Sequence, residues 1–228
     1  MELGESQIHK RQVFNMKKKL YISLLFLAAF ALWTAAICIV DVQPIGPNCS
    51  TVGFAALNRS FHALTGVHMM LYTITDWLGL IPVFCGLAFA GLGLCQWIKR
   101  KSVAKVDFNI LVLGGFYIVV LGAYLLFEEF VVNYRPVLIE GYLEASYPSS
   151  TTMLVLCFMP TAKLQLNSRI NNPIIKRCIS ITIDAFICFM VIGRLISGVH
   201  WLTDIIGGVL LSTGLVMGYW SFCGLKRK

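Results

Sequence analysis

Long apolar runs alternate with short polar connections along this chain. Six runs can be distinguished, most of them close to the roughly 20 residues that a helix needs to cross a bilayer. They cover Leu20–Val40, Leu78–Trp97, Phe108–Phe127, Ser149–Leu164, Cys178–Ser197 and Leu202–Phe222. The fourth run is the shortest, and Pro160 interrupts it near its end. The pattern predicts an all-α membrane protein with six transmembrane helices.

Residues 1–19 form a polar arm, and we expect residues 20–228 to be a single six-span membrane domain. The first run follows three lysines, as the apolar part of a signal peptide would. It is too long for a typical cleaved segment and lacks a clear A-x-A site, so we expect an anchor. Met16, directly before Lys17, is an alternative start to Met1.

The composition excludes an ordinary soluble domain, because 57% of the residues are hydrophobic and only 13% are charged. Nearly all eight cysteines fall in apolar segments, without a CxxC pair. We therefore expect small core hydrophobes, not a disulfide framework or a zinc site.

The positive charges lie mostly on one side of the predicted membrane. Of 19 lysines and arginines, 16 lie in the N-terminal arm, the second–third connection, the fourth–fifth connection and the tail. The other three are Arg59, Arg135 and Arg194. By the positive-inside rule, both termini are predicted to be cytoplasmic. The net charge of +8 thus reports topology and contact with anionic lipid, not nucleic acid.

The predicted outer connections carry most of the remaining polar chemistry. The first, Asp41–Trp77, has apolar residues at helical spacing (Phe54, Leu57, Phe61, Leu64) and is predicted to contain an amphipathic helix at the membrane surface. The second covers Glu128–Pro148, and the third is a short turn before the last run.

The stretch GRLISGVHWLTDIIGG, residues 193–208, places Arg194, His200 and Asp204 in an apolar context. Charged groups are costly at membrane depth, so three of them close together indicate a site. His200 and Asp204 are four apart, which on a predicted helix puts both on one face. The aspartate can then hold the imidazole in one tautomer and leave its other nitrogen free.

Two further segments carry groups suited to binding an anion. Arg135, in NYRP, carries a planar guanidinium fork that binds phosphate oxygens bidentately, as does Arg194. Ser149 and Ser150, in YPSSTT, begin the fourth run, where the N–H groups of a helix start would form an anion cradle.

At these residues the sequence resembles the type 2 phosphatidic acid phosphatase superfamily of integral membrane lipid phosphatases. The family pattern is K-x6-R-P, then P-S-G-H, then S-R-x5-H-x3-D. Here the third motif reads G-R-x5-H-x3-D from Gly193 to Asp204, the first keeps Arg135-Pro136, and the second reads P-S-S-T from Pro148. The resemblance covers roughly residues 128–204.

The resemblance implies a metal-independent phosphatase without a cofactor, its active site on the outer face of a bacterial plasma membrane. His200 would be the nucleophile that forms a phospho-histidine, and Asp204 would orient it. Arg135, Arg194 and Ser149 would bind the phosphoryl oxygens. The substrate would be a lipid phosphate or lipid diphosphate of the membrane.

Two positions depart from the family pattern. Glu128 stands where the first motif has lysine, and Thr151 where the second has the histidine that protonates the leaving group. Such an acid typically contributes ~10²–10⁴-fold in rate, and threonine has no accessible pKa. A diphosphate, which expels a more acidic leaving group, would need it less. His62, His68 or Tyr147 are alternative proton donors.

Three other interpretations remain open at this stage. The protein could bind phosphorylated lipids without turning them over. Arg194 and Asp204 could form only an interfacial ion pair, with His200 structural. A transporter or channel is a third class, although broken inverted-repeat spans are not evident.

Overall fold

A computed structural model describes residues 2–223, and within that range the regular elements are helices. The α-helices are α1 (Glu2–Ile39), α2 (Ala55–Thr65), α3 (Met69–Leu78), α4 (Leu80–Arg100), α5 (Phe108–Glu129), α6 (Ser150–Arg169), α7 (Pro173–Ile196) and α8 (Leu202–Cys223). Two single 3₁₀ turns are Pro47–Cys49 and Val103–Lys105. The all-α prediction is confirmed.

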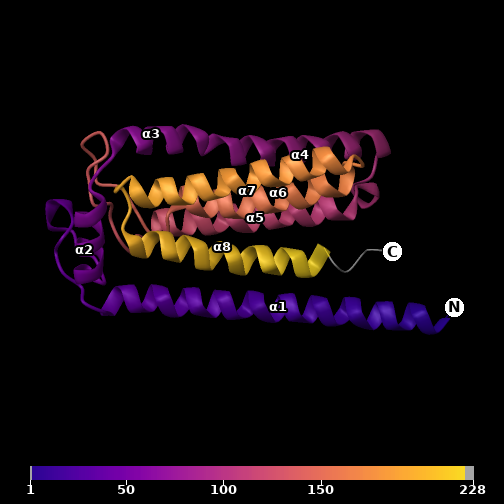
Figure 1. Cartoon of the computed structure of the whole chain (residues 1–228), viewed down its shortest axis with the longest axis horizontal. Helices are drawn as coiled ribbons and strands as arrows, with labels where there is room; N and C mark the ends of the chain where they lie inside the picture. The colour runs from indigo at the N-terminus through magenta and orange to yellow at the C-terminus, as the bar shows by residue number, and fades with distance from the viewer. Residues whose placement is uncertain (1, 224–228) are drawn as a thin grey trace.

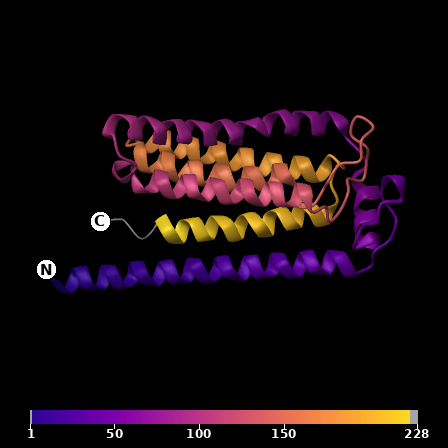
Figure 2. The same cartoon turned by 180° about the vertical axis from the view of Figure 1, so that it is seen from behind.

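The long helices lie side by side, and α2 lies across one end of them (Figures 1 and 2). α1 runs along α8, and α6 contacts α4, α5, α7 and α8. The basic N-terminal part of α1 belongs to the same helix as the first predicted span, so the arm and that span are one element. The Glu2 end of α1 and the Cys223 end of α8 lie together at the end away from α2 (Figure 1).

Within residues 2–223, five helical segments, with α3 and α4 counted as one, are long and apolar enough to cross a membrane. The fourth predicted span does form a helix, α6, which at 20 residues is long enough to cross a membrane but is not apolar enough to be among these five. Ten of its residues are buried, among them Thr151, Thr152, Thr161 and Gln165. Because neighbouring helices cover these side chains, α6 does not need the apolar surface of a lipid-facing helix.

The second predicted span begins earlier than its apolar run indicated. Helical backbone at Gly79 joins α3 to α4, so the helical segment runs from Met69 to Arg100. This extension places Tyr72 and Asp76 on a rigid element beside the second outer connection. The predicted amphipathic helix of the first connection is present as α2.

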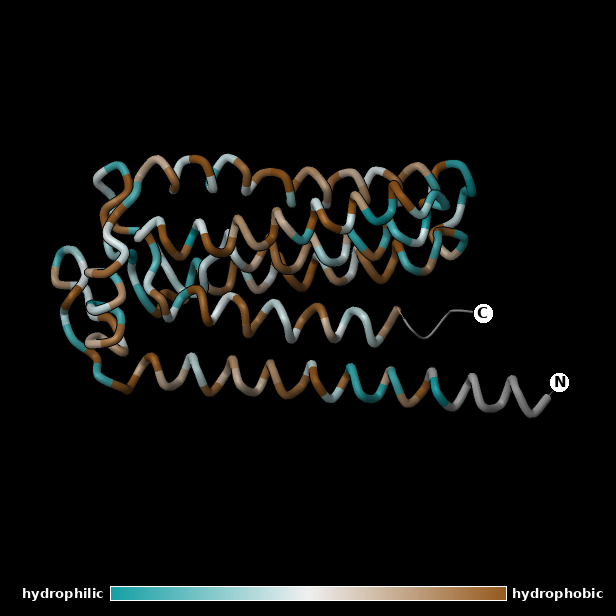
Figure 3. The backbone as a smooth tube through the Cα atoms, in the orientation of Figure 1, coloured by the Kyte–Doolittle hydropathy of each residue, from teal (hydrophilic) through white to brown (hydrophobic). Residues whose placement is uncertain are grey.

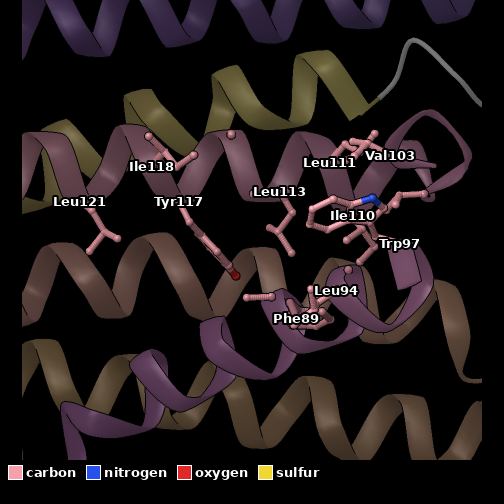
Figure 4. A pocket seen from close by; sticks show the side chains of 15 residues that line it. Phe89, Leu94, Trp97, Val103, Ile110, Leu111, Leu113, Tyr117, Ile118 and Leu121 are labelled. Atoms are coloured by element: carbon pink, nitrogen blue, oxygen red, sulfur yellow. The ribbon is translucent and has the colours of Figure 1, made fainter. Parts of the chain in front are cut away.

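Hydropathy divides the molecule along its length. Hydrophilic positions gather towards the two ends of the bundle, and hydrophobic positions dominate between them (Figure 3). One pocket of about 530 Å³ lies between α4 and α5 near the Lys105 turn. Its lining side chains are hydrocarbon apart from the Tyr117 hydroxyl and the Trp97 indole nitrogen (Figure 4), so it lacks groups for phosphate chemistry.

Candidate active site

The second outer connection folds back on itself, which brings Arg135 close to Ser146. Antiparallel bridge pairing joins Tyr134 to Ala145. The amide of Ser146 donates to the carbonyl of Asn133 at 2.9 Å, and the amide of Arg135 donates to that of Glu144 at 3.0 Å. These backbone bonds fix the start of the Arg135 side chain relative to Ser146.

The turn between α7 and α8 is held against α2 and the loop after it. Gly198 has a φ of +69°, and a Cβ there would lie 1.9 Å from the carbonyl oxygen of Gly66. Both the positive φ and this close approach require glycine. The indole of Trp201 donates to the carbonyl of Tyr134 at 2.8 Å, which ties the turn to the second outer connection.

Asp204 is a buried carboxylate that binds three donors from separate segments. Its side chain accepts from the amide of Trp201 at 2.9 Å, from the amide group of Asn133 at 3.2 Å, and from the hydroxyl of Ser146. The first bond places the carboxylate at the N-terminus of α8, where negative charge is stabilised. Asp204 thereby joins α8 to both ends of the second outer connection.

The sequence placed His200 and Asp204 on one helical face, and the structure differs. His200 lies in the turn before α8 begins, and its Nδ1 is 3.9 Å from Oδ2 of Asp204. That separation is too long for a hydrogen bond. The nearest acceptors of Nδ1 belong to Ser146: the carbonyl oxygen at 3.2 Å and the hydroxyl oxygen at 3.3 Å. Ser146 therefore stands between the histidine and the aspartate.

His200 has one nitrogen held and one free. With Ser146 accepting at Nδ1, the neutral ring carries its proton there, and Nε2 retains its lone pair. Nε2 is buried and has no hydrogen-bond partner among the described residues. Burial, reinforced by the positive charges of Arg135 and Arg194, holds the pKa of His200 well below its ordinary value of 6.5. The imidazole is thus neutral near neutral pH.

Arg135 and Arg194 come from different segments and meet over one aromatic ring. Their guanidinium carbons lie 5.8 Å and 5.0 Å from the centroid of Tyr72. Arg135 Nε lies 3.0 Å from a carboxylate oxygen of Glu144, and Arg194 Nη1 lies 3.5 Å from one of Asp76. Arg135 Nη1 and Arg194 Nε are buried without a hydrogen-bond acceptor in the described part of the chain.

The start of α6 adds further groups. Ser149 occupies the N-cap position, but its side chain makes no capping bond, and its buried Oγ has no partner within residues 2–223. Its amide donates to the carbonyl of Asp204 at 3.1 Å, which anchors α6 beside α8. The helix start that was predicted as an anion cradle is therefore anchored directly to the His200–Asp204 segment.

A pocket of about 630 Å³ opens where these segments meet. Arg135, Arg194 and Ser150 line it, and so do the two positions that depart from the family pattern, Glu128 and Thr151. The other lining residues are Tyr72, Asp76, Tyr124, Val131, Tyr134, Leu143, Glu144 and Ala145. No cluster of three metal-ligating side chains occurs among the residues that the structure describes.

The three proton donors considered from the sequence lie outside this lining. His62 Nε2 is 3.1 Å from the carbonyl of Gly198, and His68 Nε2 is 2.9 Å from that of Thr65. The Tyr147 hydroxyl is 2.7 Å from that of Thr34, and burial raises the pKa of Tyr147. None of the three is placed as a substitute for the missing histidine of the second motif.

Several site residues had no signal in the sequence reading. Asn133 and Ser146 flank the motifs, but their bonds to Asp204 depend on how the connection folds back. Tyr72 and Asp76 were assigned to an outer loop, and only the early start of α3 brings them to the arginines. Glu144 was not singled out as a site residue in the sequence, and in the structure it pairs with Arg135.

Comparison with known proteins supports the motif interpretation. Residues 124–228 match the family model of the PAP2 superfamily. The fold is similar to the crystal structure of the first transmembrane PAP2-type phosphatidylglycerolphosphate phosphatase from Bacillus subtilis, with 19% identity and a TM-score of 0.56. That match covers 91% of this chain and 98% of the other. No curated protein sequence matches the chain. The predicted resemblance is thus confirmed as a PAP2-superfamily match over residues 124–228, with a fold similar to that of a transmembrane PAP2-type phosphatase.

Proposed function

We propose that the protein removes phosphate from a membrane lipid phosphate or lipid diphosphate, without a metal, through a phospho-histidine on His200. One observation carries the proposal: Nε2 of His200 is buried and unpartnered while Nδ1 is held by Ser146. A histidine fixed in this tautomer presents a lone pair to an incoming phosphorus atom. The low pKa of His200 keeps that lone pair free of a proton near neutral pH.

The two arginines supply the positive charge that the reaction needs. Arg135 and Arg194 approach the same face of the site and retain unpartnered buried N–H groups. Buried, preorganised guanidinium groups stabilise the negative charge that spreads over the phosphoryl oxygens in the transition state. The unpartnered hydroxyl of Ser149 and the amides at the start of α6 add further donors.

Asp204 has a positioning role in this proposal and acts on His200 through Ser146. The carboxylate accepts the Ser146 hydroxyl, and the Ser146 carbonyl accepts from Nδ1. As phosphorus–nitrogen bonding makes the ring cationic, the buried carboxylate 3.9 Å away stabilises that charge. The catalytic set thus becomes His200, Arg135, Arg194 and Ser149, positioned by Ser146, Asn133 and Asp204.

A second function, binding a phosphorylated lipid without cleaving it, is favoured by one observation. Thr151 lines the pocket where the family has its proton donor, and in the described part of the chain no histidine, His200 included, belongs to that lining. An enzyme without this acid would be slow on leaving groups that depart as alkoxides. Phosphate release from a lipid diphosphate or from phosphatidic acid would support the phosphatase function. Binding of these lipids without phosphate release would support the binding function.

We further propose that the site faces the outside of a bacterial plasma membrane. The segments that form the site meet at the α2 end of the bundle, opposite the N-terminal end of α1 and the C-terminal end of α8 (Figure 1). Lys17–Lys19 and the Lys99–Lys105 connection are remote from it, which fits the positive-inside rule with both termini and residues 1–19 in the cytoplasm. A fluorescent protein fused after Lys228 that folds only in the cytoplasm should fluoresce, and a periplasm-only reporter there should be inactive.

The main test measures phosphate release by purified protein in detergent containing EDTA. We expect release from a lipid diphosphate, an acid-labile phosphoprotein intermediate, and loss of both in His200→Ala. His68→Ala, which changes an exposed histidine outside the pocket, is the matched control and should retain activity. Substrate binding by the wild type with no release from any lipid phosphate would establish the binding function instead.

A further inference from the structure

The apolar pocket between α4 and α5 is an open groove on the side of the bundle, which we call the α4–α5 groove. Its volume of about 530 Å³ is within the range of sites that hold small molecules. Ile110 and Leu113 are buried and form its floor, whereas Leu94 and Ile118 line it and are largely exposed. The groove therefore opens sideways from the bundle, towards the lipid of a surrounding membrane.

The shape and chemistry of the α4–α5 groove suit one hydrocarbon chain. Tyr117 contributes a hydroxyl group, but this group lies 3.2 Å from the hydroxyl of Thr161 and is already paired inside the bundle. Along α5 the lining runs from Ile110 to Leu121, a rise of about 16 Å. One leaflet supplies about half of the ~30 Å hydrocarbon core of a bilayer. The groove thus has the length of an acyl chain that runs from the membrane interface to the middle of the bilayer.

Positive charge gathers at the end of the groove that the α4–α5 connection forms. Lys99, Lys101 and Lys105 lie there, each within two positions of a lining residue. All three are exposed, and none is within ion-pair distance of a carboxylate in the described part of the chain. A hydrocarbon groove therefore ends beside three uncompensated ammonium groups.

The acidic residue of this connection is already engaged. Asp107 accepts a hydrogen bond from Gln96 at 2.8 Å and one from Arg100 at 2.9 Å. Arg100 also donates to the carbonyl of Lys105, which holds the connection in a closed turn. These bonds fix the backbone at the end of the groove and leave the lysine ammonium groups to a ligand.

From these observations we propose that the α4–α5 groove binds an anionic phospholipid, with one acyl chain along α5 and the phosphate beside Lys99, Lys101 and Lys105. Trp97 lies at the same end of the groove as Val103 (Figure 4), and an indole ring suits the level of lipid headgroups. Basic pockets between membrane helices on the cytoplasmic side bind anionic headgroups.

This lipid is a bound partner and not the substrate. The α4–α5 connection lies at the end of the bundle away from α2, opposite the segments that form the candidate active site (Figure 1). The inference does not depend on the proposed phosphatase function. With the orientation proposed above, the lipid belongs to the cytoplasmic leaflet.

A second copy of the chain fits the groove less well. Two copies that met at this face in the same orientation would bring their own Lys99, Lys101 and Lys105 together, because a symmetric interface uses the same patch on both subunits. Like charges at this distance repel. A lipid phosphate instead supplies the negative charge that the connection lacks.

Native mass spectrometry with equal amounts of dioleoyl phosphatidylglycerol and dioleoyl phosphatidylcholine tests the site. The two lipids have the same chains, and only the first is anionic. The wild type should retain phosphatidylglycerol in preference by at least about tenfold, since each basic residue near a headgroup contributes about fivefold in affinity. The double variant Lys101→Gln, Lys105→Gln should lose most of this preference. Lys176→Gln with Arg177→Gln, at the start of α7 and outside the lining, is the matched control and should keep it.

Gly114→Leu tests the groove itself. Gly114 lines the groove, and a Cβ there meets nothing within 4 Å, so a leucine can enter the space that the acyl chain needs. Retention of phosphatidylglycerol should fall to the level of phosphatidylcholine. Gly122→Leu, on the same helix with equally open space but outside the lining, should bind as the wild type does.

Equal retention of the two lipids by the wild type would overturn the inference, and so would an unchanged preference in the lysine variant. Dimers that disappear in Gly114→Leu but persist in Gly122→Leu would also overturn it, because a second copy would then fill the groove. The lysine variant changes exposed residues of a connection, so it decides the question even if Gly114→Leu does not fold.

Discussion

The carbonyl oxygen of Ser146 lies 3.2 Å from Nδ1 of His200, and the hydroxyl of the same serine donates to Asp204. One residue of the second outer connection therefore links the proposed nucleophile to the carboxylate four positions after it. The position and tautomer of His200 thus depend on how that connection folds, not on α8 alone.

Replacing Ser146 by alanine tests this link. The backbone carbonyl stays, but buried Asp204 loses a hydroxyl donor, and hydrogen bonds to charged groups contribute about 1.5–3 kcal/mol. We expect kcat for phosphate release to fall about tenfold or more and the melting temperature to drop by several degrees. Ser102→Ala, which changes a half-buried serine at the opposite end of the bundle, should alter neither. A normal kcat in folded Ser146→Ala would show that the hydroxyl plays no part.

Replacing Arg194 by lysine tests the need for a guanidinium fork. Arg194 is 1% exposed and lies over Tyr72, so an ammonium keeps the charge but loses the planar, two-pronged geometry. We expect affinity for orthovanadate, a mimic of transferring phosphate, to fall at least about tenfold. Isothermal titration in detergent measures this. Arg59→Lys changes an exposed arginine on α2 and should leave the affinity as it is.

Restoring the second motif by Thr151→His tests the role of the leaving group. Position 151 lines the pocket, so the new imidazole can reach a bound phosphate ester. We expect the rate on phosphatidic acid to rise by ~10²-fold, with little change on a lipid diphosphate, whose leaving group needs less protonation. Thr65→His, on α2 and outside the pocket, is the control. An equal gain on both lipids would contradict the leaving-group explanation.

The depressed pKa of His200 predicts how stability depends on pH. In the unfolded chain this histidine takes up a proton near pH 6.5, whereas in the folded protein it does so only at lower pH. The free energy of unfolding should therefore be highest above about pH 6.5 and decline as the pH falls below it. The melting temperature of the wild type should therefore fall relative to that of His200→Asn as the pH drops below about 6.5.

Close packing at Gly207 gives a prediction independent of function. A Cβ there would lie 2.4 Å from the ring of Tyr147, which is buried and hydrogen-bonded to Thr34. Gly207→Ala should destabilise the protein by about 1–3 kcal/mol through overpacking. Gly122→Ala, on α5 with open space around the new methyl group, should be neutral or slightly stabilising. Thermal unfolding of both variants in one detergent decides the comparison.

The helices could be predicted because their signal is local. A run such as Phe108–Phe127 specifies its own helix by composition and length, and α5 covers Phe108–Glu129. α6 was predicted with the right start but is not apolar enough to be identified as a span, since α4, α5, α7 and α8 shield its polar residues. Its membrane role therefore depends on contacts that no local window contains.

The site was predictable only in part, for a related reason. Arg135, Arg194, His200 and Asp204 could be singled out because the motif spacing is itself sequence information. The contact of Ser146 with His200 spans 54 residues, and that of Asp76 with Arg194 spans 118. Such pairs arise when separate segments pack, so Ser146 and the carboxylates of Asp76 and Glu144 were not predicted as site residues.

The buried hydroxyl and amide groups of α6 also bear on how the chain reaches its membrane. A segment carrying Thr151, Thr152, Thr161 and Gln165 would gain little from entering lipid by itself, because each polar group would face hydrocarbon. Those groups become covered as α4, α5, α7 and α8 pack around α6, with Thr161 against Tyr117 of α5 and Gln165 against Tyr219 of α8. We therefore expect α6 to enter the bilayer together with its neighbouring helices and not by itself.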